Sequence, residues 1–159
     1  MNIQLVVMAA AMVILASAVP APASQVISAY VTFYGFDDND DGDPGNTGTD
    51  IISNPILHET ANEDLGTYDR PGTLATDLEF LAAGTRVYVP ALKRYYIMED
   101  TCRPCEKDWK KKKPHVDLYL SGTGAKLAEC EDRLTMERAV IIVDPPSDLP
   151  VKEGPACAE

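Results

Sequence analysis

The prediction of the fold starts from residues 84–100, which read GTRVYVPALKRYYIMED. Two short segments within this stretch, 86–90 and 95–99, are rich in the β-branched and aromatic residues that favour strands. The four residues between them, 91–94, suit a hairpin loop. We therefore predict two adjacent strands in the middle of the chain.

The flanking sequence predicts more short strands and one helix. The helix is expected at 124–134, where Leu127, Cys130 and Leu134 recur at helical spacing. The long stretch 35–72 is rich in Asp, Asn, Gly and Thr, and we expect it to be an irregular loop. Further strands are expected at 27–34, about 73–77, 115–120 and 139–143. Many short strands with one short helix predict a mainly β protein, a small closed barrel.

Composition limits the class of protein. The chain has 159 residues, which is enough for one domain. Its 25 acidic and 14 basic side chains give a net charge of −11, which argues against nucleic acid as a partner because phosphate binding needs a basic surface. Hydrophobic residues make up 45% of the chain, so it can bury a core and is not expected to be disordered.

The N-terminus predicts secretion. Residues 5–16 form an apolar run that is too short to span a bilayer, and small residues follow at 16–18 and 21–23. This pattern is typical of a signal peptide covering residues 1–18, or 1–23 if the second site is cleaved. The alternative is an N-terminal membrane anchor. We expect a secreted, extracellular monomer that has no membrane contact after the signal is removed.

The domain boundaries follow from the same patterns. We expect a barrel domain at 26–146, with the loop 35–72 inside it, and an extended tail at 147–159. The four cysteines, Cys102, Cys105, Cys130 and Cys157, all lie in the expected mature chain. In an oxidising compartment they form two disulfides, for which three connectivities are open. No thioredoxin-like βαβ pattern surrounds the Cys-x-x-Cys pair, and a zinc site would need a second pair of ligands, so structural disulfides are favoured.

Three aspartates stand on or at the ends of expected strands: Asp77, Asp100 and Asp117. A carboxylate on an apolar strand is costly to bury unless it is hydrogen-bonded, paired or solvated in a cleft. In the strand 115–120, side chains alternate, so His115, Asp117 and Tyr119 share the face opposite Val116 and Leu118. An imidazole, a carboxylate and a phenol on one surface suit sugar chemistry, although a solvated strand face would show the same pattern.

Three segments in the same order resemble a known family. GTRVYVP at 84–90, Glu-Asp-Thr at 99–101 and HVDLY at 115–119 are similar to the three-aspartate (3D) domain, a double-psi β-barrel of the RlpA-like group that also occurs in lytic transglycosylase A. YVTFYG at 30–35 resembles the first barrel strand of expansins and related endoglucanases. The resemblance implies a six-stranded double-psi β-barrel.

The resemblance also implies an activity. Asp117 would be the catalytic acid/base, Asp100 its partner across a cleft, and Asp77 the third defining aspartate. His115, Tyr119 and Tyr34 would contact the substrate, a cell-wall polysaccharide such as peptidoglycan, glucan or chitin. No cofactor or metal is implied, because carboxylates alone can run this chemistry. The alternatives are a non-catalytic, expansin-like wall-binding or wall-loosening protein, and a secreted scaffold or effector protein.

Two features of the long loop have both a functional and an ordinary interpretation. Tyr68 and Asp69 precede the barrel block and are candidates for the rim of the cleft, although Gly, Thr and Asp also form turns. Asp37, Asn39 and Asp41 have the spacing at which a calcium loop begins. The glutamate that such a loop needs at its twelfth position is replaced by Gly48, so a solvated acidic loop is favoured.

Overall fold

The protein is described by a computed structural model covering residues 23–40, 43 and 45–157. Its elements are β1 (Gln25–Tyr34), β2 (Gly72–Thr76), β3 (Arg86–Val89), β4 (Arg94–Thr101), α1 (Arg103–Trp109), β5 (His115–Tyr119), α2 (Ala125–Leu134) and β6 (Met136–Val143). Nearly all of the expected signal segment lies outside the described residues. No helix among the described residues is long and apolar enough to cross a membrane.

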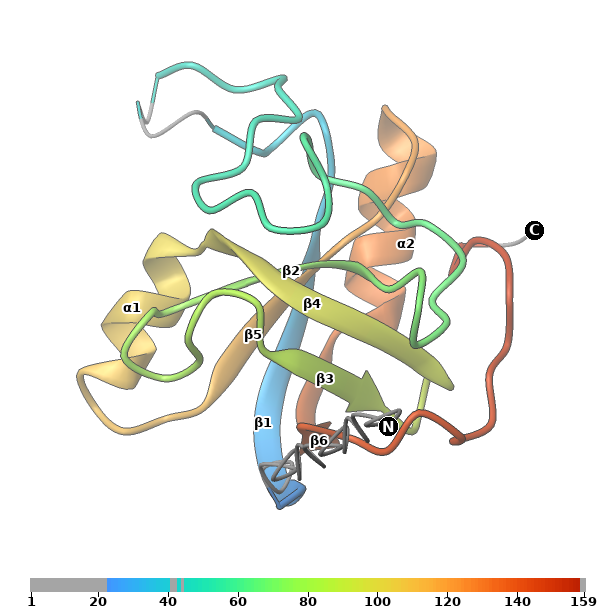
Figure 1. Ribbon diagram of the computed structural model, residues 1–159. Helices are drawn as coiled ribbons and strands as arrows, with labels where there is room; N and C mark the ends of the chain where they lie inside the picture. Colours follow the sequence, from blue (N-terminus) through green and yellow to red (C-terminus); the bar gives the residue numbers. More distant parts are fainter. Residues whose placement is uncertain (1–22, 41–42, 44, 158–159) are drawn as a thin grey trace, which may run out of the picture.

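The six strands close into a barrel in the order β1-β5-β2-β4-β3-β6 (Figure 1). The pairs β1–β5 and β2–β4 are parallel, and the other four pairs are antiparallel. Only β3 and β4 are neighbours both in the ring and in the sequence, so the chain must cross the barrel between the other pairs. This arrangement confirms the predicted mainly β, six-stranded barrel and corrects the number of helices from one to two.

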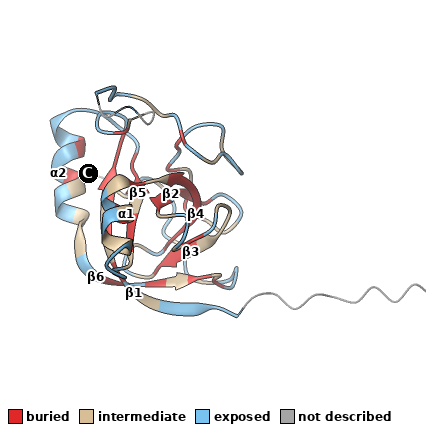
Figure 2. Ribbon diagram, turned by 90° about the vertical axis from the view of Figure 1, so that its left-hand side faces the viewer, coloured by how far each residue is buried: buried red, intermediate tan, exposed pale blue. Residues whose placement is uncertain are grey.

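Alternating side chains fill the barrel. Val31 and Phe33 of β1, Val116 and Leu118 of β5, and Ile141 of β6 point into one apolar core. Their neighbours along each strand lie on the opposite face, as the two-residue period of a strand requires, and several of these, such as Tyr34 and Tyr119, are buried in a second cluster. Figure 2 shows that the buried positions follow the strands, whereas much of the surface of α2 is exposed. The strand alternation predicted for 115–120 is thus confirmed.

Helix α1 forms between the expected strands 95–99 and 115–120, where the sequence predicted no helix. Pro104 stands in its first turn, where the missing backbone N–H costs nothing. A disulfide joins Cys102 to Cys105, and the Cys102 sulfur accepts a hydrogen bond from the Cys105 N–H at 3.1 Å. Side-chain capping and the covalent link together stabilise a seven-residue helix that has too few apolar positions to show a helical pattern.

The long loop between β1 and β2 lies across one end of the barrel, above β2 and β4 in Figure 1. Glu99, a fully buried residue of β4, holds it there. One carboxylate oxygen accepts hydrogen bonds from the backbone N–H groups of Ile56, Leu57 and His58. The other lies 2.6 Å from His58 Nδ1. A buried carboxylate with this many donors is strongly satisfied, so the loop is fixed over the barrel.

The tail after β6 packs along the barrel. The hydroxyl of Tyr95 donates to the carbonyl of Pro146 at 2.7 Å, and that of Tyr88 donates to the carbonyl of Pro150 at 2.5 Å. A second disulfide joins Cys130 of α2 to Cys157 near the end of the chain. Of the three connectivities left open by the sequence, the structure has Cys102–Cys105 with Cys130–Cys157.

Candidate active site in the barrel groove

A groove of about 380 Å³ opens at the end of the barrel that carries α1 and the long loop. Strands β1, β2, β4 and β5, the start of α1 and the loop all contribute to its walls. The lining residues are Tyr34, Asp38, Asn39, Asp40, Ser53, Ala75, Asp100, Thr101, Cys102, Arg103, Pro104, Lys107 and Asp117. Two of the three sequence-predicted aspartates, Asp100 and Asp117, therefore share one groove.

Asp117 is held by the strand beside it. In the parallel pairing of β1 with β5, Thr32 lies opposite Asp117, and the Thr32 hydroxyl is 2.6 Å from Asp117 Oδ1. Burial raises the pKa of Asp117 from 3.8 to about 7. The Thr32 hydrogen bond opposes this rise, and the negative charges of Asp38 and Asp100 add to it. The groove thus contains a carboxyl group that holds a proton near neutral pH.

Asp100 sits at the end of β4 and is almost completely buried. Its Oδ1 accepts hydrogen bonds from the Ser53 N–H at 3.0 Å, the Ser53 hydroxyl at 2.9 Å and the Thr101 N–H at 2.8 Å. Its Oδ2 accepts one from the Tyr34 hydroxyl at 3.2 Å. Burial raises the pKa of Asp100, and these four donors oppose the rise. Both oxygens therefore accept hydrogen bonds from the protein itself, three at Oδ1 and one at Oδ2.

His115 lies behind the groove and does not line it. Only 4% of the residue is exposed, and its ring packs on Tyr30 with the centroids 4.5 Å apart. Its Nε2 is 2.9 Å from the Thr32 hydroxyl oxygen, and its Nδ1 is 2.9 Å from Asp108 Oδ2. Burial lowers the pKa of His115, although Asp108 opposes this. The expectation that His115 contacts substrate is corrected, because the ring is enclosed by protein.

The two tyrosines that follow on this face differ in position. Tyr34 lines the groove and points its hydroxyl at Asp100. Tyr119 packs edge-on against Tyr34, with ring centroids 5.3 Å apart, inside a second buried cluster. Tyr119 therefore supports the Tyr34 ring and offers no groove surface of its own, which corrects its expected role as a sugar contact.

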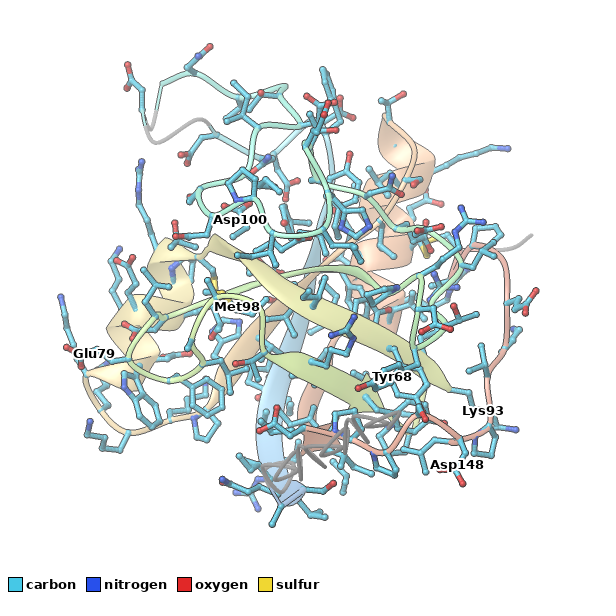
Figure 3. The ribbon with its side chains drawn as sticks, in the orientation of Figure 1. Tyr68, Glu79, Lys93, Met98, Asp100 and Asp148 are labelled. Atoms are coloured by element: carbon cyan, nitrogen blue, oxygen red, sulfur yellow. A yellow bond between two sulfur atoms is a disulfide. The ribbon has the colours of Figure 1, made fainter. Side chains whose placement is uncertain are left out.

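Three other predicted site residues lie outside the groove lining. The carboxylate of Asp77 accepts a hydrogen bond from the Glu79 N–H at 2.7 Å and caps the turn after β2. Tyr68 packs against Tyr95 and lies under the Arg86 guanidinium, far from Asp100 in Figure 3. Asp69 beside it is exposed. The short turn-forming segments that suggested these residues are used here for turns and packing.

Several residues in or beside the groove were not predicted from the sequence. Thr32 does not line the groove but donates to Asp117, and it could have been found because it shares a strand face with Tyr34 at the two-residue period. Ser53 and Asp38 come from the long irregular loop, where no periodicity indicates which side chains turn inward. Arg103 and Lys107 line the groove because α1 forms, and the sequence gave no helical pattern there.

Metal binding has little support among the described residues. Ligand atoms of Cys102, Cys105 and His115 lie within 4.8 Å of one another, but both sulfurs are in a disulfide and thus not thiolate ligands. Of the candidate calcium ligands, Asp41 lies outside the described residues. The Asn39 amide nitrogen donates to two backbone carbonyls, and Asp37 accepts a hydrogen bond from the Gly124 N–H. These two side chains hold the loop together.

The fold and site define a class of protein: a closed six-stranded β-barrel with a groove that is bordered by a disulfide and contains a carboxyl group with a pKa of about 7. The chain belongs to the family described as the DDB_G0273701 N-terminal domain, whose sequence model matches residues 26–158. The match includes both the barrel and the tail.

One relative is an uncharacterized protein of Dictyostelium discoideum, 36% identical over 136 residues. The matched segment covers 84% of this chain and 57% of that protein, so the chain spans little more than half of its relative. No solved structure matches the chain. The description of the matching family names neither three-aspartate domains nor expansins, so that resemblance stays a prediction.

Proposed function

We propose that the protein acts on a cell-wall polysaccharide in the barrel groove, with Asp117 as the general acid/base. The observation that carries this proposal is that Asp117 lines the groove together with Asp100, in surroundings that raise the pKa of Asp117 to about 7 through burial. At pH 7 about half of the molecules then carry the proton, compared with about one in a thousand for an ordinary aspartate. A general acid must hold its proton at the working pH and release it to the leaving group.

The surroundings of Asp100 favour chemistry with one carboxyl group. Hydrolysis by a pair of carboxylates needs the second one free to activate water or attack the sugar. The oxygens of Asp100 already accept four hydrogen bonds from Ser53, Thr101 and Tyr34. A lytic transglycosylase-like reaction is therefore preferred over a two-carboxylate glycosidase, and Asp100 acts through its charge on Asp117.

The reaction proceeds in two proton steps at Asp117. The acid donates its proton to the glycosidic oxygen as the bond from that oxygen to the anomeric carbon breaks. The resulting carboxylate then removes the proton from a hydroxyl of the same sugar as this hydroxyl bonds to the anomeric carbon. The products are two chains: the leaving chain ends in a new hydroxyl group, the other chain ends in an anhydro-sugar, and Asp117 is protonated again. Neither water nor a cofactor is consumed.

A second candidate function uses the same groove without cleavage. In this case Asp117 only hydrogen-bonds sugar hydroxyls, as in an expansin-like wall-binding protein. The hydrogen bonds to Asp100 favour this candidate too, because a carboxyl group held by Ser53, Thr101 and Tyr34 is not free to activate water. A third possibility is a scaffold whose groove binds no sugar.

Secretion and a monomeric state complete the proposal. Both disulfides are formed, and disulfides persist in oxidising compartments. The apolar run at 5–16, followed by small residues, is typical of a secretory signal. The site is contained in one chain, so catalysis needs no second copy.

The test is a digestion panel. Disulfide-intact protein is incubated with peptidoglycan, cellulose, chitin and mixed glucans, and soluble products are identified by mass spectrometry. Asp117→Asn is the test variant. Asp148→Asn is the matched control, because Asp148 is exposed and lies far from Asp100 in Figure 3.

Each outcome decides between the candidates. Anhydro-sugar products from wild type and the control, but not from Asp117→Asn, support the transglycosylase-like function. Products with reducing ends indicate hydrolysis instead. Polymer that pulls down the protein without yielding products identifies an expansin-like binder. Neither products nor binding would overturn the proposal and leave the scaffold.

A further inference from the structure

A hydrogen-bonded chain leads from the groove into the protein. It begins at Asp117 Oδ1, passes through the Thr32 hydroxyl at 2.6 Å and reaches His115 Nε2 at 2.9 Å. From the other ring nitrogen of His115 it continues to Asp108 Oδ2 at 2.9 Å. The Lys113 ammonium lies 3.1 Å from the same Asp108 oxygen.

The protons along this chain are constrained by Thr32. A threonine hydroxyl has one proton, so it donates to Asp117 or to His115, and the other partner must then donate to it. The His115 Nδ1 faces a carboxylate whose pKa is lowered by its Lys113 and His115 contacts, so Nδ1 carries a proton. Two arrangements satisfy every bond: a protonated Asp117 with a neutral His115, or an ionised Asp117 with an imidazolium.

The two arrangements contain the same number of protons and the same net charge. They interconvert when the Asp117 proton passes to the Thr32 oxygen while the hydroxyl proton of Thr32 passes to Nε2. One O–H bond forms on Thr32 as another breaks, so the hydroxyl is regenerated. No oxidant, reductant or external base takes part.

We propose that Thr32 is a proton relay through which Asp117 and His115 hold one shared proton. Thr32 and His115 are then positioning residues, since neither is among the residues that line the groove. The relay links the groove to Asp108 and to Lys113, whose side chain is about half exposed. Asp117 can thus be reprotonated from behind while the groove is filled by a ligand.

The charges around the relay act on both of its ends. Asp108 and Lys113 face His115, the first favouring and the second disfavouring an imidazolium. Asp38 and Asp100 face Asp117 and favour its protonated form. Tyr34 and Glu131 also interact with the Asp117 charge. Burial raises the pKa of both side chains, which favours their neutral forms beside Asp117. The acidic groove thus draws the shared proton toward Asp117, and Asp108 draws it toward His115.

The role of the relay in sugar cleavage rests on the proposed function, but the shared proton does not. Its test is a pH titration of the disulfide-intact protein by NMR, which follows the ring nitrogens of His115 and the carboxyl carbon of Asp117. Two groups that share a proton titrate with the midpoints of the pair, so both signals should change at the same two pH values. If Asp117 and His115 of the wild-type protein each titrate with a single midpoint, and the two midpoints differ, the relay is wrong.

Thr32→Val removes the hydroxyl, and Thr32→Ser is the matched control that keeps it. In Thr32→Val we expect Asp117 and His115 each to titrate with a single midpoint of its own. In Thr32→Ser we expect both signals to change at the same two pH values, as in wild type. Shared midpoints that persist in Thr32→Val would contradict the proposal. If Thr32→Val does not fold, Asp108→Asn serves instead. Without the Asp108 charge, His115 should stop responding at the upper midpoint and Asp117 should carry the whole change, whereas an unchanged His115 response would refute the relay.

The digestion panel separates the two proposals. A shared proton without sugar products leaves the relay standing and removes the proposed function. Sugar products from a protein whose Asp117 and His115 titrate independently would support the proposed function and remove the relay.

Discussion

Asp117→Asn should stabilise the folded protein above neutral pH and should abolish the proposed cleavage of polysaccharide. Below pH 3.8, Asp117 is a neutral acid in both the folded and the unfolded chain, so its burial carries no charge penalty. Above this pH the unfolded chain releases the proton, but the folded chain keeps it until about pH 7. The folded state binds more protons in this window, so the stability of wild type falls as the pH rises through it.

The magnitude follows from the two pKa values. Each tenfold change in proton affinity corresponds to about 1.4 kcal/mol, so the rise from 3.8 to about 7 corresponds to about 4 kcal/mol at pH 7 and above. Water screens the partly exposed carboxylate, which lowers the expected value to about 2–4 kcal/mol. The asparagine amide is never charged. Its N–H₂ group also donates to Thr32 as the protonated acid does, so the chain to a neutral His115 stays satisfied.

The assay is urea denaturation of wild type and Asp117→Asn from pH 4 to pH 8, with both disulfides intact. Asp100 and Glu131, whose pKa values are also raised, titrate in the same direction in both proteins and largely cancel in the difference. The free energy of unfolding of the variant minus that of wild type should be near zero at pH 4 and about 2–4 kcal/mol at pH 8. Asp148→Asn should give a flat difference. A flat difference for Asp117→Asn as well would mean that the folded chain does not hold the Asp117 proton above the usual range of an aspartate.

Two further predictions concern what holds the loop and the tail. Replacing Cys130 and Cys157 by serine removes a disulfide that joins residues 27 positions apart, which should lower the free energy of unfolding by about 3–4 kcal/mol. An unchanged midpoint of urea denaturation would show that the hydrogen bonds of the tail hold it in place without the disulfide. Glu99→Gln removes the negative charge of the side chain that accepts three hydrogen bonds from backbone N–H groups of the long loop. We expect the free energy of unfolding to fall by about 2–4 kcal/mol and the segment between β1 and β2 to be cut rapidly by protease. Protease resistance equal to that of wild type would contradict this role for Glu99.

The barrel could be predicted because its strands carry their own pattern. Val116 and Leu118 alternate with His115, Asp117 and Tyr119, and the structure keeps this alternation. The two disulfide pairs could not be assigned, because pairing depends on how α2 and the tail meet in space. Helix α1 was missed, since its stability comes from a disulfide and a proline in the first turn, neither of which produces a periodic signal.

The site was predictable only where it lies on strands. Asp100 and Asp117 were recognised as carboxylates on apolar strands, and both line the groove. Ser53, which donates twice to Asp100, comes from an irregular loop whose path is set by the buried Glu99 more than forty residues later. Tyr68 was misplaced for the same reason: its ring packs against Tyr95 at the other end of β4. Such long-range contacts are decided by the fold as a whole.

The ionisation of Asp117 underlies both its acid/base role and the relay. It is measured by following the carboxyl carbon of Asp117 by NMR from pH 3 to pH 9, with Asp117→Asn to assign the signal. We predict that the carboxyl group keeps its proton past the ordinary range of an aspartate and loses it around pH 7. A single midpoint near 4 would mean that the groove contains an ordinary carboxylate, and the proposed acid/base role of Asp117 would be wrong.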